Sequence, residues 1–380
     1  MDSKQREKTY EDKLLKRAVA GSMLFGMVSF VLGVLLGIWK IALLRGISVP
    51  PIPHLLPPHG NLMVGGFLGT LILFERMFAL PKKSLLWVPY IWGLSVLFVH
   101  TNHIFKFLNF IALFGWGIHR FIAYRTFKRI GIPLIEFLAY VVLSSALITP
   151  DGLAGSFASA LSALSFAITI IALERIELTM SAERKSARVV YLILIIYLFI
   201  LLIDLLVYDF PPQLFGFFLI LIAFGMIYND PVALSAFRRF RTSGTPLSRF
   251  SRETLIVGYI WLFFGALSLI FLDFISLKRD VVYHTLGLGF IFTMILSHAP
   301  IILGVILSKV PDKPPSRFLF YMFQLMTFLR IFTDLFYSEF FKIWVWSGVI
   351  TGTLHFSIFI FYILTVLKGF RVFKVEQKLF

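Results

Sequence analysis

The chain has 380 residues, enough for about two or three soluble domains, but its composition excludes that organisation. Hydrophobic residues make up 58% and charged residues only 15%, whereas a soluble domain is usually about 45–50% apolar and about 25% charged. The net charge of +16 does not indicate nucleic acid, because the basic residues lie in short segments between apolar runs. The absence of cysteine excludes disulfides, iron–sulfur clusters and thiol chemistry. The composition therefore predicts an all-α polytopic membrane protein whose main partner is the lipid bilayer.

Residues 1–17 are charged and lack the apolar region and cleavage site of a signal peptide, so we expect a short basic cytoplasmic segment. Beyond it, a helix needs about 20 apolar residues to cross the bilayer. Segments that meet this requirement lie near 18–43, 61–80, 85–101, 104–124, 132–149, 153–174, 189–208, 212–228, 254–276, 281–308, 317–337 and 343–367. No intervening stretch is long and polar enough for a soluble domain. The sequence predicts a single transmembrane domain over 1–380, with about 12 helices.

Lysine and arginine are concentrated in the N-terminus and in the loops on its side of the membrane, where they include Arg120, Arg125 and Arg175. The opposite loops hold few basic residues beyond Arg45, Lys106, Lys278, Arg279 and Lys342. Because basic loops stay in the cytoplasm, this asymmetry predicts that both termini are cytoplasmic and that the plasma membrane is the location.

Two histidines open apolar segments in a similar way. His59 follows Pro57-Pro58 and precedes Gly60, Gly65, Gly66 and Gly69, which leave one side of the helix nearly bare. His284 precedes Gly287 and Gly289 at the same outer depth in the tenth segment. The glycines fit close helix packing, or alternatively the flat face of a haem held by two histidines from opposite sides.

These two segments carry a resemblance. The run His59-Gly60-x-Leu62-Met63-Val64 resembles the second helix of haem–copper oxidase subunit I, where a similar run supplies a ligand of the low-spin haem. The run His284-Thr285-Leu286-x-x-Gly289, with Met294, is similar to the tenth helix of NnrS-type membrane proteins. The resemblance implies an oxidase subunit I-like arrangement and a haem b ligated by His59 and His284, with Gly66 and Gly287 against it. It also implies a role in electron transfer or in the nitric oxide response.

The chain departs from the oxidase pattern where the binuclear centre would lie. Val282 occupies the position of the second histidine of a His-x-His pair, and the segments 153–174 and 189–208 contain no histidine. Copper and a high-spin haem need those imidazoles, so oxygen reduction at a binuclear centre is excluded. A bis-histidine iron has no open coordination site, and the sequence does not indicate an enzyme.

Arg330 lies within the eleventh segment, with Asp334 four residues on. An intramembrane arginine is rare and is normally paired or functional. Two interpretations stay open: Arg330 pairs with Asp334, or Arg330 binds a haem propionate near the outer face.

The remaining histidines suggest further metal ligands. His298 lies fourteen residues after His284, so the two share one helix face, and a second haem would need His119 or His355 as partner. Alternatively His298 is structural, and Pro300 frees a carbonyl for its imidazole. His100 and His103 could bind copper or zinc with His54, although such histidines are usually solvated.

The leading hypothesis is therefore a haem b membrane protein with an electron-transfer partner at the outer face. The alternative is a secondary transporter without a cofactor, in which Arg330 and Asp334 bind an anion or a proton. Against that alternative, the sequence shows no paired helix interruptions at corresponding midplane positions.

Overall fold

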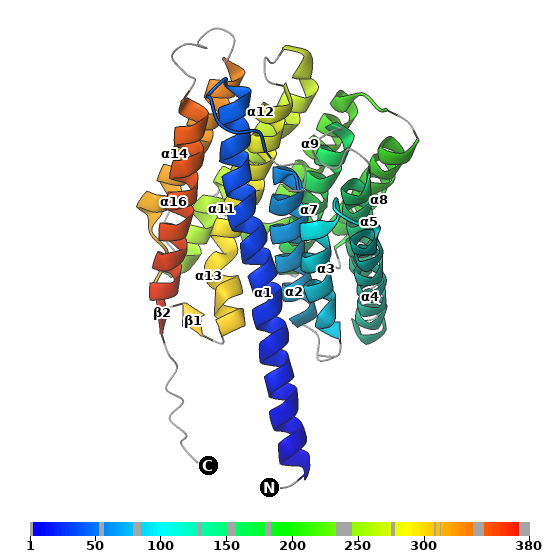
Figure 1. Ribbon diagram of the computed structural model, residues 1–380. Helices are drawn as coiled ribbons and strands as arrows, with labels where there is room; N and C mark the ends of the chain where they lie inside the picture. Colours follow the sequence, from blue (N-terminus) through cyan, green and yellow to red (C-terminus); the bar gives the residue numbers. More distant parts are fainter. Residues whose placement is uncertain are drawn as a thin grey trace. The chain divides into compact units, whose positions relative to one another are not determined.

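The computed structural model describes residues 3–52, 57–78, 85–127, 131–149, 157–178, 184–207, 209–232, 245–274, 278–307, 309–311, 313–336 and 346–371. Nearly all of these residues are helical (Figure 1). Ten of the described helices are long and apolar enough to cross a membrane, which indicates a multi-pass membrane protein. The chain groups into two compact units: 1–174 with 188–211, and 175–187 with 212–380.

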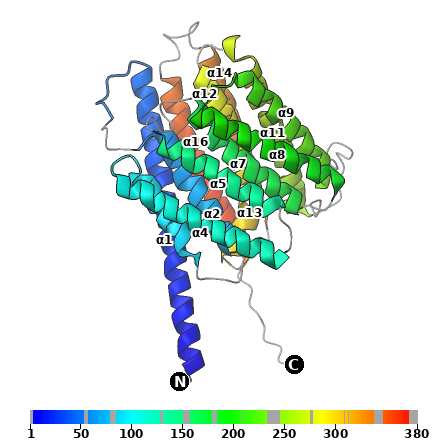
Figure 2. The ribbon, with the colours of Figure 1, turned by 90° about the vertical axis from the view of Figure 1, so that its right-hand side faces the viewer.

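The first unit begins with a long helix, α1, which runs from Ser3 to Leu44 and whose apolar part starts at Ala20. The π-helix η1 (Asn61–Gly69) continues into α2 (Thr70–Phe78). The unit also contains α3 (Trp87–Phe98), α4 (His103–Phe127), α5 (Gly131–Ile148), α7 (Phe157–Leu178) as far as Glu174, and α8 (Lys185–Leu206) from Arg188. Helix α1 packs on η1 and α3, and α4 lies alongside α5 (Figure 2).

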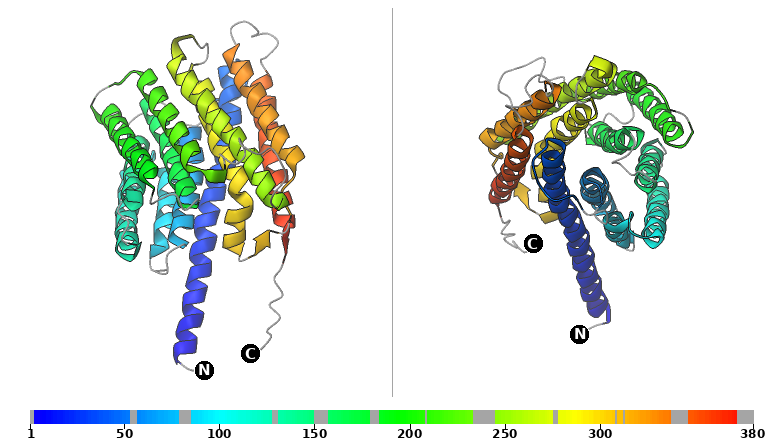
Figure 3. Two further views of the ribbon diagram at one scale, coloured as in Figure 1. Left: turned by 180° about the vertical axis from the view of Figure 1, so that it is seen from behind. Right: turned by 45° about the horizontal axis from the view of Figure 1, so that its top comes forward.

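The second unit is built from α9 (Pro212–Asn229), α11 (Pro246–Ile270), η3 (Leu272–Phe274), α12 (Lys278–His284), η4 (Thr285–Phe292), α13 (Thr293–Leu307), α14 (Arg317–Leu335) and α16 (Ser347–Lys368). Helix α9 packs on α11 (Figure 3, left), and α14 packs on α16. A short antiparallel pair, β1 (Val310–Pro311) with β2 (Phe370–Arg371), joins the ends of α13 and α16.

The helices follow the apolar segments expected from the sequence, with shifted ends. Helix α11 begins at Pro246 rather than near 254, because the Thr245 hydroxyl caps it by accepting from the Ser248 amide at 3.2 Å. Helix α4 continues to Phe127, and Arg120 and Arg125, both expected in a loop, lie inside it. Helix α3 spans only 12 residues. Among the described helices it is an apolar one too short for a full span, whereas η1 and α2 together form one continuous helical segment.

Two helices change to π-helical geometry directly after a histidine. In η1 this geometry runs from Asn61 to Gly69, two residues after His59. In η4 it runs from Thr285 to Phe292, immediately after His284. Such wider turns are rare and occur frequently at functional sites, because they redirect side chains that an α-helix would bury elsewhere.

Candidate functional site

The His59 ring is held by helix α1. Its Nδ1 lies 2.5 Å from the carbonyl oxygen of Gly33, to which it donates a hydrogen bond. One turn further along α1, a Cβ at Gly37 would lie 2.7 Å from the Cε1 and Nδ1 atoms of the ring. The ring therefore occupies the space of the absent Gly37 side chain. A proton on Nδ1 leaves Nε2 as the ring nitrogen suited to bind a metal.

The glycines that follow His59 are covered by neighbouring helices. A Cβ at Gly65 would lie 2.9 Å from the Leu147 side chain, and one at Gly66 would lie 2.5 Å from the Ser29 hydroxyl. One at Gly69 would lie 2.8 Å from the Trp92 Nε1. Close helix packing accounts for these three glycines. A haem-facing role for Gly66 stays a prediction.

His284 is held by its own helix. Its Nδ1 donates to the carbonyl oxygen of Asp280 at 2.8 Å, and the Asp280 carboxylate oxygen Oδ1 lies 3.6 Å from the same nitrogen. As with His59, this fixes the tautomer that leaves Nε2 for a metal. Gly287, three residues on in η4, is half-buried.

Arg330 lies at the centre of a charged cluster in the second unit. Its guanidinium is 5% exposed and pairs with Asp334, which is fully buried, and with Asp280 at 2.5 Å. This confirms the pairing of Arg330 with Asp334, and Asp280 is a second ion-pair partner of Arg330. One ligand atom each from Asp280, His284 and Asp334 lies within 4.8 Å of the others. A haem propionate would reach Arg330 only by replacing one of its two carboxylates.

His355 and His298 each have both ring nitrogens close to a partner. His355 lies edge-on to Phe323, with Nδ1 2.8 Å from the Thr351 carbonyl and Nε2 3.0 Å from the Thr327 hydroxyl. His298 donates from Nδ1 to the Met294 carbonyl at 2.8 Å and accepts from Arg175 at Nε2, also at 2.8 Å. Either imidazole would have to exchange one of these partners to bind a metal.

The expectation that Pro300 frees a carbonyl for His298 is wrong. Pro300 has no amide proton, so the carbonyl of Leu296, four residues earlier, loses its helical donor. The Tyr362 hydroxyl donates to that carbonyl at 2.6 Å. His298 instead binds the carbonyl of Met294 within its own helix.

Arg175 connects His298 to Asp230 and Tyr259 through hydrogen bonds within the second unit. Its Nε and Nη2 donate to Asp230 Oδ2 at 2.9 and 2.7 Å, and the Tyr259 hydroxyl donates to the same oxygen at 3.0 Å. All of these side chains are buried. Arg175 therefore belongs to a buried network rather than to a solvated loop.

A comparable buried cluster lies in the first unit. Glu136 of α5 pairs with Arg120 of α4 and with Arg76 of α2, the latter at 3.1 Å. Arg120 also donates to His119 Nδ1 at 2.7 Å and lies 4.1 Å above the Trp116 ring. Because His119 Nδ1 accepts this hydrogen bond, that nitrogen cannot also bind a metal in this arrangement.

The outer histidines do not form a described metal cluster. His54 lies outside the described residues. His100 Nε2 accepts a hydrogen bond from the Asn61 side chain, and His103 is exposed at the start of α4. Burial, together with the charge of Lys106, lowers the pKa of His100 and so favours the neutral ring that accepts this hydrogen bond.

The structure thus brings His284 and Arg330 together within the second unit and places His59 in the first unit. A comparison with protein families matches residues 18–368 to the model of a domain of unknown function, DUF8744. The chain belongs to the DUF8744 family. No curated protein and no solved structure matches it.

Three carboxylates of this DUF8744 member were not singled out from the sequence: Asp280, Asp230 and Glu136. A signal exists for Asp280, which lies four residues before His284 and so one helical turn away. Asp230 and Glu136 lie 55 and 16 residues from the arginines they pair with. Their pairing depends on helix packing, which sequence spacing does not reveal.

Proposed function

We propose that the protein is an integral membrane haem b protein in which His59 and His284 are the axial ligands. Such a haem supplies one-electron transfer, or a gas response when one ligand is displaced by nitric oxide. Each of the two imidazoles donates from Nδ1 to a backbone carbonyl, at 2.5 and 2.8 Å. His298 and His355 also contact a backbone carbonyl through Nδ1, but they lie within α-helices. The observation that carries this function is that, at His59 and His284, this contact is combined with an adjacent π-helical segment.

This environment suits metal ligation because metal-binding histidines almost always donate their other ring N–H to a carbonyl, carboxylate or water. The donor fixes the tautomer and orients the ring. Both histidines also stand next to π-helical segments, η1 and η4. Both histidines combine a backbone hydrogen bond with an adjacent π-helix, although they belong to separate units. This similarity favours one shared function over two unrelated packing effects.

The remaining assignments follow from the same proposal. Arg330 would anchor a propionate by exchanging Asp280, the more exposed of its two carboxylates, with 29% of its side chain accessible. The haem would lie toward the outer face of the plasma membrane, where an electron-transfer partner docks, and both termini would be cytoplasmic. His298 and His355 would be the ligands of a second haem or metal, and copper would bind to His100 and His103.

The test is a reduced-minus-oxidised optical spectrum of the purified full chain, made with haem in good supply. We expect a low-spin b-type signal in the wild type and its loss in both His59→Ala and His284→Ala. His103→Ala is the matched control, because His103 is exposed at the start of α4, and it should keep the signal. A colourless wild-type protein, or a signal that survives both ligand substitutions, would refute the assignment.

A second candidate function is proton- or cation-coupled transport. The observation that favours it is the group formed by Asp280, His284 and Asp334 around Arg330, since intramembrane ionisable side chains mark ion pathways. In proteoliposomes with an internal pH dye, this function predicts a proton flux that Asp334→Asn abolishes. Proton flux in a colourless protein would place transport first, whereas a coloured protein without flux would exclude it.

A further inference from the structure

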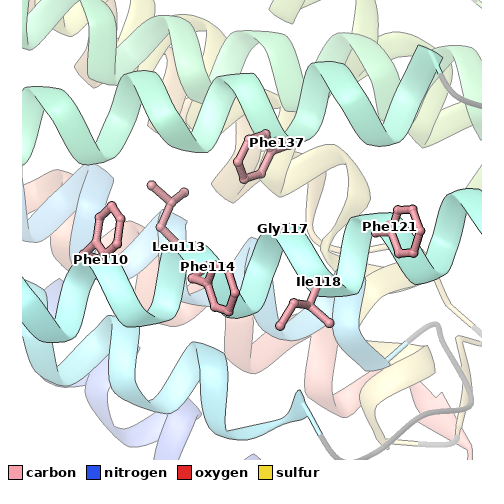
Figure 4. Close-up of a pocket in the computed structure, with 7 residues that line it drawn as sticks. All are labelled: Phe110, Leu113, Phe114, Gly117, Ile118, Phe121 and Phe137. Atoms are coloured by element: carbon pink, nitrogen blue, oxygen red, sulfur yellow. The ribbon is translucent and has the colours of Figure 1, made fainter.

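An apolar groove lies along helix α4, where Phe137 of α5 leans over it (Figure 4). The groove measures about 400 Å³, within the range of about 300–1,000 Å³ that is usual for ligand pockets. Its walls on α4 include Phe110, Phe114 and Phe121. The figure shows these rings spaced along the helix, so the groove is elongated rather than round.

Gly117 forms the floor of this groove. A Cβ at this position would lie 3.0 Å from Cε2 of Phe137, closer than an ordinary contact. The ring of Phe137 therefore packs closely over the backbone of α4, and a side chain at residue 117 would require the ring to shift. A larger residue at position 117 would fill the groove or displace Phe137, so the size of this residue determines how much of the groove is open to a ligand.

The walls of the groove are hydrocarbon. Phe114 is 66% exposed and Phe121 is 58% exposed, on a helix that is apolar and long enough to span a membrane. On such a helix the surface faces lipid, and an elongated slot between rings and a glycine fits a flexible alkyl chain. The lining residues offer no side-chain hydrogen-bond donor or acceptor, so the groove selects for an apolar chain.

A cation lies just beyond the end of the groove. The guanidinium carbon of Arg125 lies 5.7 Å from the centre of the Phe121 ring, one turn past the last wall residue. Arg125 is exposed, and Tyr124 beside it is also exposed, as aromatic residues often are at a membrane interface. The surface therefore combines a hydrocarbon slot with a positive charge at one end.

We propose that this groove is a binding site for an anionic phospholipid. One acyl chain lies along α4 beside Gly117 and Phe137, and the phosphate of the headgroup contacts Arg125. The amphiphile matches the surface in both parts, because an anionic headgroup is attracted to a basic residue at the membrane surface. The chain's net charge of +16 favours anionic lipid in general, and the groove gives that preference a location.

The experiment is native mass spectrometry of the full chain in detergent, with phosphatidylglycerol or phosphatidylcholine added at equal concentration. We expect wild-type protein to retain phosphatidylglycerol preferentially. Arg125→Gln should lower its occupancy about fivefold, the effect of one basic residue near an anionic surface. Gly117→Leu should lower the occupancy of both lipids, because the leucine side chain fills the slot.

Arg188→Gln is the matched control, because Arg188 is exposed near the start of α8 and does not line the groove. It should leave lipid occupancy unchanged. Equal retention of the two lipids by wild type, or unchanged occupancy in Arg125→Gln, would overturn the assignment. The assignment would also be overturned if the protein formed a dimer that Gly117→Leu dissociates, because a second copy of the chain would then cover the groove. These outcomes do not depend on haem.

Discussion

At the scale of single residues, the buried charges of the described helices are arranged in pairs. Arg330 lies against Asp280 and Asp334, Arg175 against Asp230, and Arg120 against Glu136. An isolated charge in a membrane interior is costly, and removal of one partner from a buried pair costs about 3–5 kcal/mol. The sequence predicts the Arg330–Asp334 pair because its spacing is one helical turn. It cannot predict Arg175–Asp230, because Arg175 lies in α7 and Asp230 follows the end of α9.

The first prediction concerns Gly37, whose missing side chain leaves room for the His59 ring. Gly37→Ala should displace the His59 ring, because the added Cβ would lie 2.7 Å from it. Overpacking of this kind costs about 1–3 kcal/mol. We expect the melting temperature to fall and, if His59 is a haem ligand, the low-spin signal to weaken or change its g values. Thermal unfolding and electron paramagnetic resonance of the same sample check both effects.

Gly26→Ala is the control for this substitution. Gly26 lies eleven residues earlier on nearly the same face of α1, since eleven residues at about 100° each complete just over three whole turns. Its nearest neighbour for an added Cβ is the Thr70 methyl group at 3.9 Å, an ordinary contact. We expect Gly26→Ala to behave like the wild type. Equal effects of both substitutions would show that α1 tolerates no alanine here and that His59 is not specifically positioned.

At the scale of whole elements, apolar length predicts where the helices lie, and local chemistry decides where they end. The Thr245 cap and Pro246 start α11 earlier than hydropathy alone indicates. The π-helices η1 and η4 could not be predicted, because an i→i+5 pattern depends on how an extra residue packs against neighbours. Their position next to His59 and His284 is therefore information that only the structure supplies.

The kink-forming proline of α13 gives a prediction for an element. Pro300 leaves the Leu296 carbonyl without a helical donor, and the buried Tyr362 hydroxyl supplies one at 2.6 Å. Tyr362→Phe leaves that carbonyl unsatisfied, at a cost of about 1–3 kcal/mol. We expect a lower melting temperature. Tyr321→Phe, at an exposed position of α14, should have little effect, and comparable losses in both variants would argue against a role for this hydrogen bond.

At the scale of the whole molecule, the expected single transmembrane chain is made of two compact units. The apolar segments in the sequence do not reveal this division, because each unit contains apolar helices long enough to cross a membrane. Packing within a unit decides it: α1, η1 and α3 contact one another, and α11 contacts both α9 and η4. The division matters for the proposed function, because it assigns the two candidate haem ligands to different units.

The orientation of the chain can be tested without a background signal, because the chain has no cysteine. Thr101 lies just before α4 and Thr126 in its last turn, and both are exposed, so a cysteine at each reports on opposite ends of one helix. The distribution of lysine and arginine predicts that Thr101 is outside the cell and Thr126 inside. A membrane-impermeant thiol reagent should therefore label Thr101→Cys in intact cells and Thr126→Cys only after permeabilisation. The reverse pattern would invert the topology, which would move His59 and His284 to the cytoplasmic side and exclude an electron donor at the outer face.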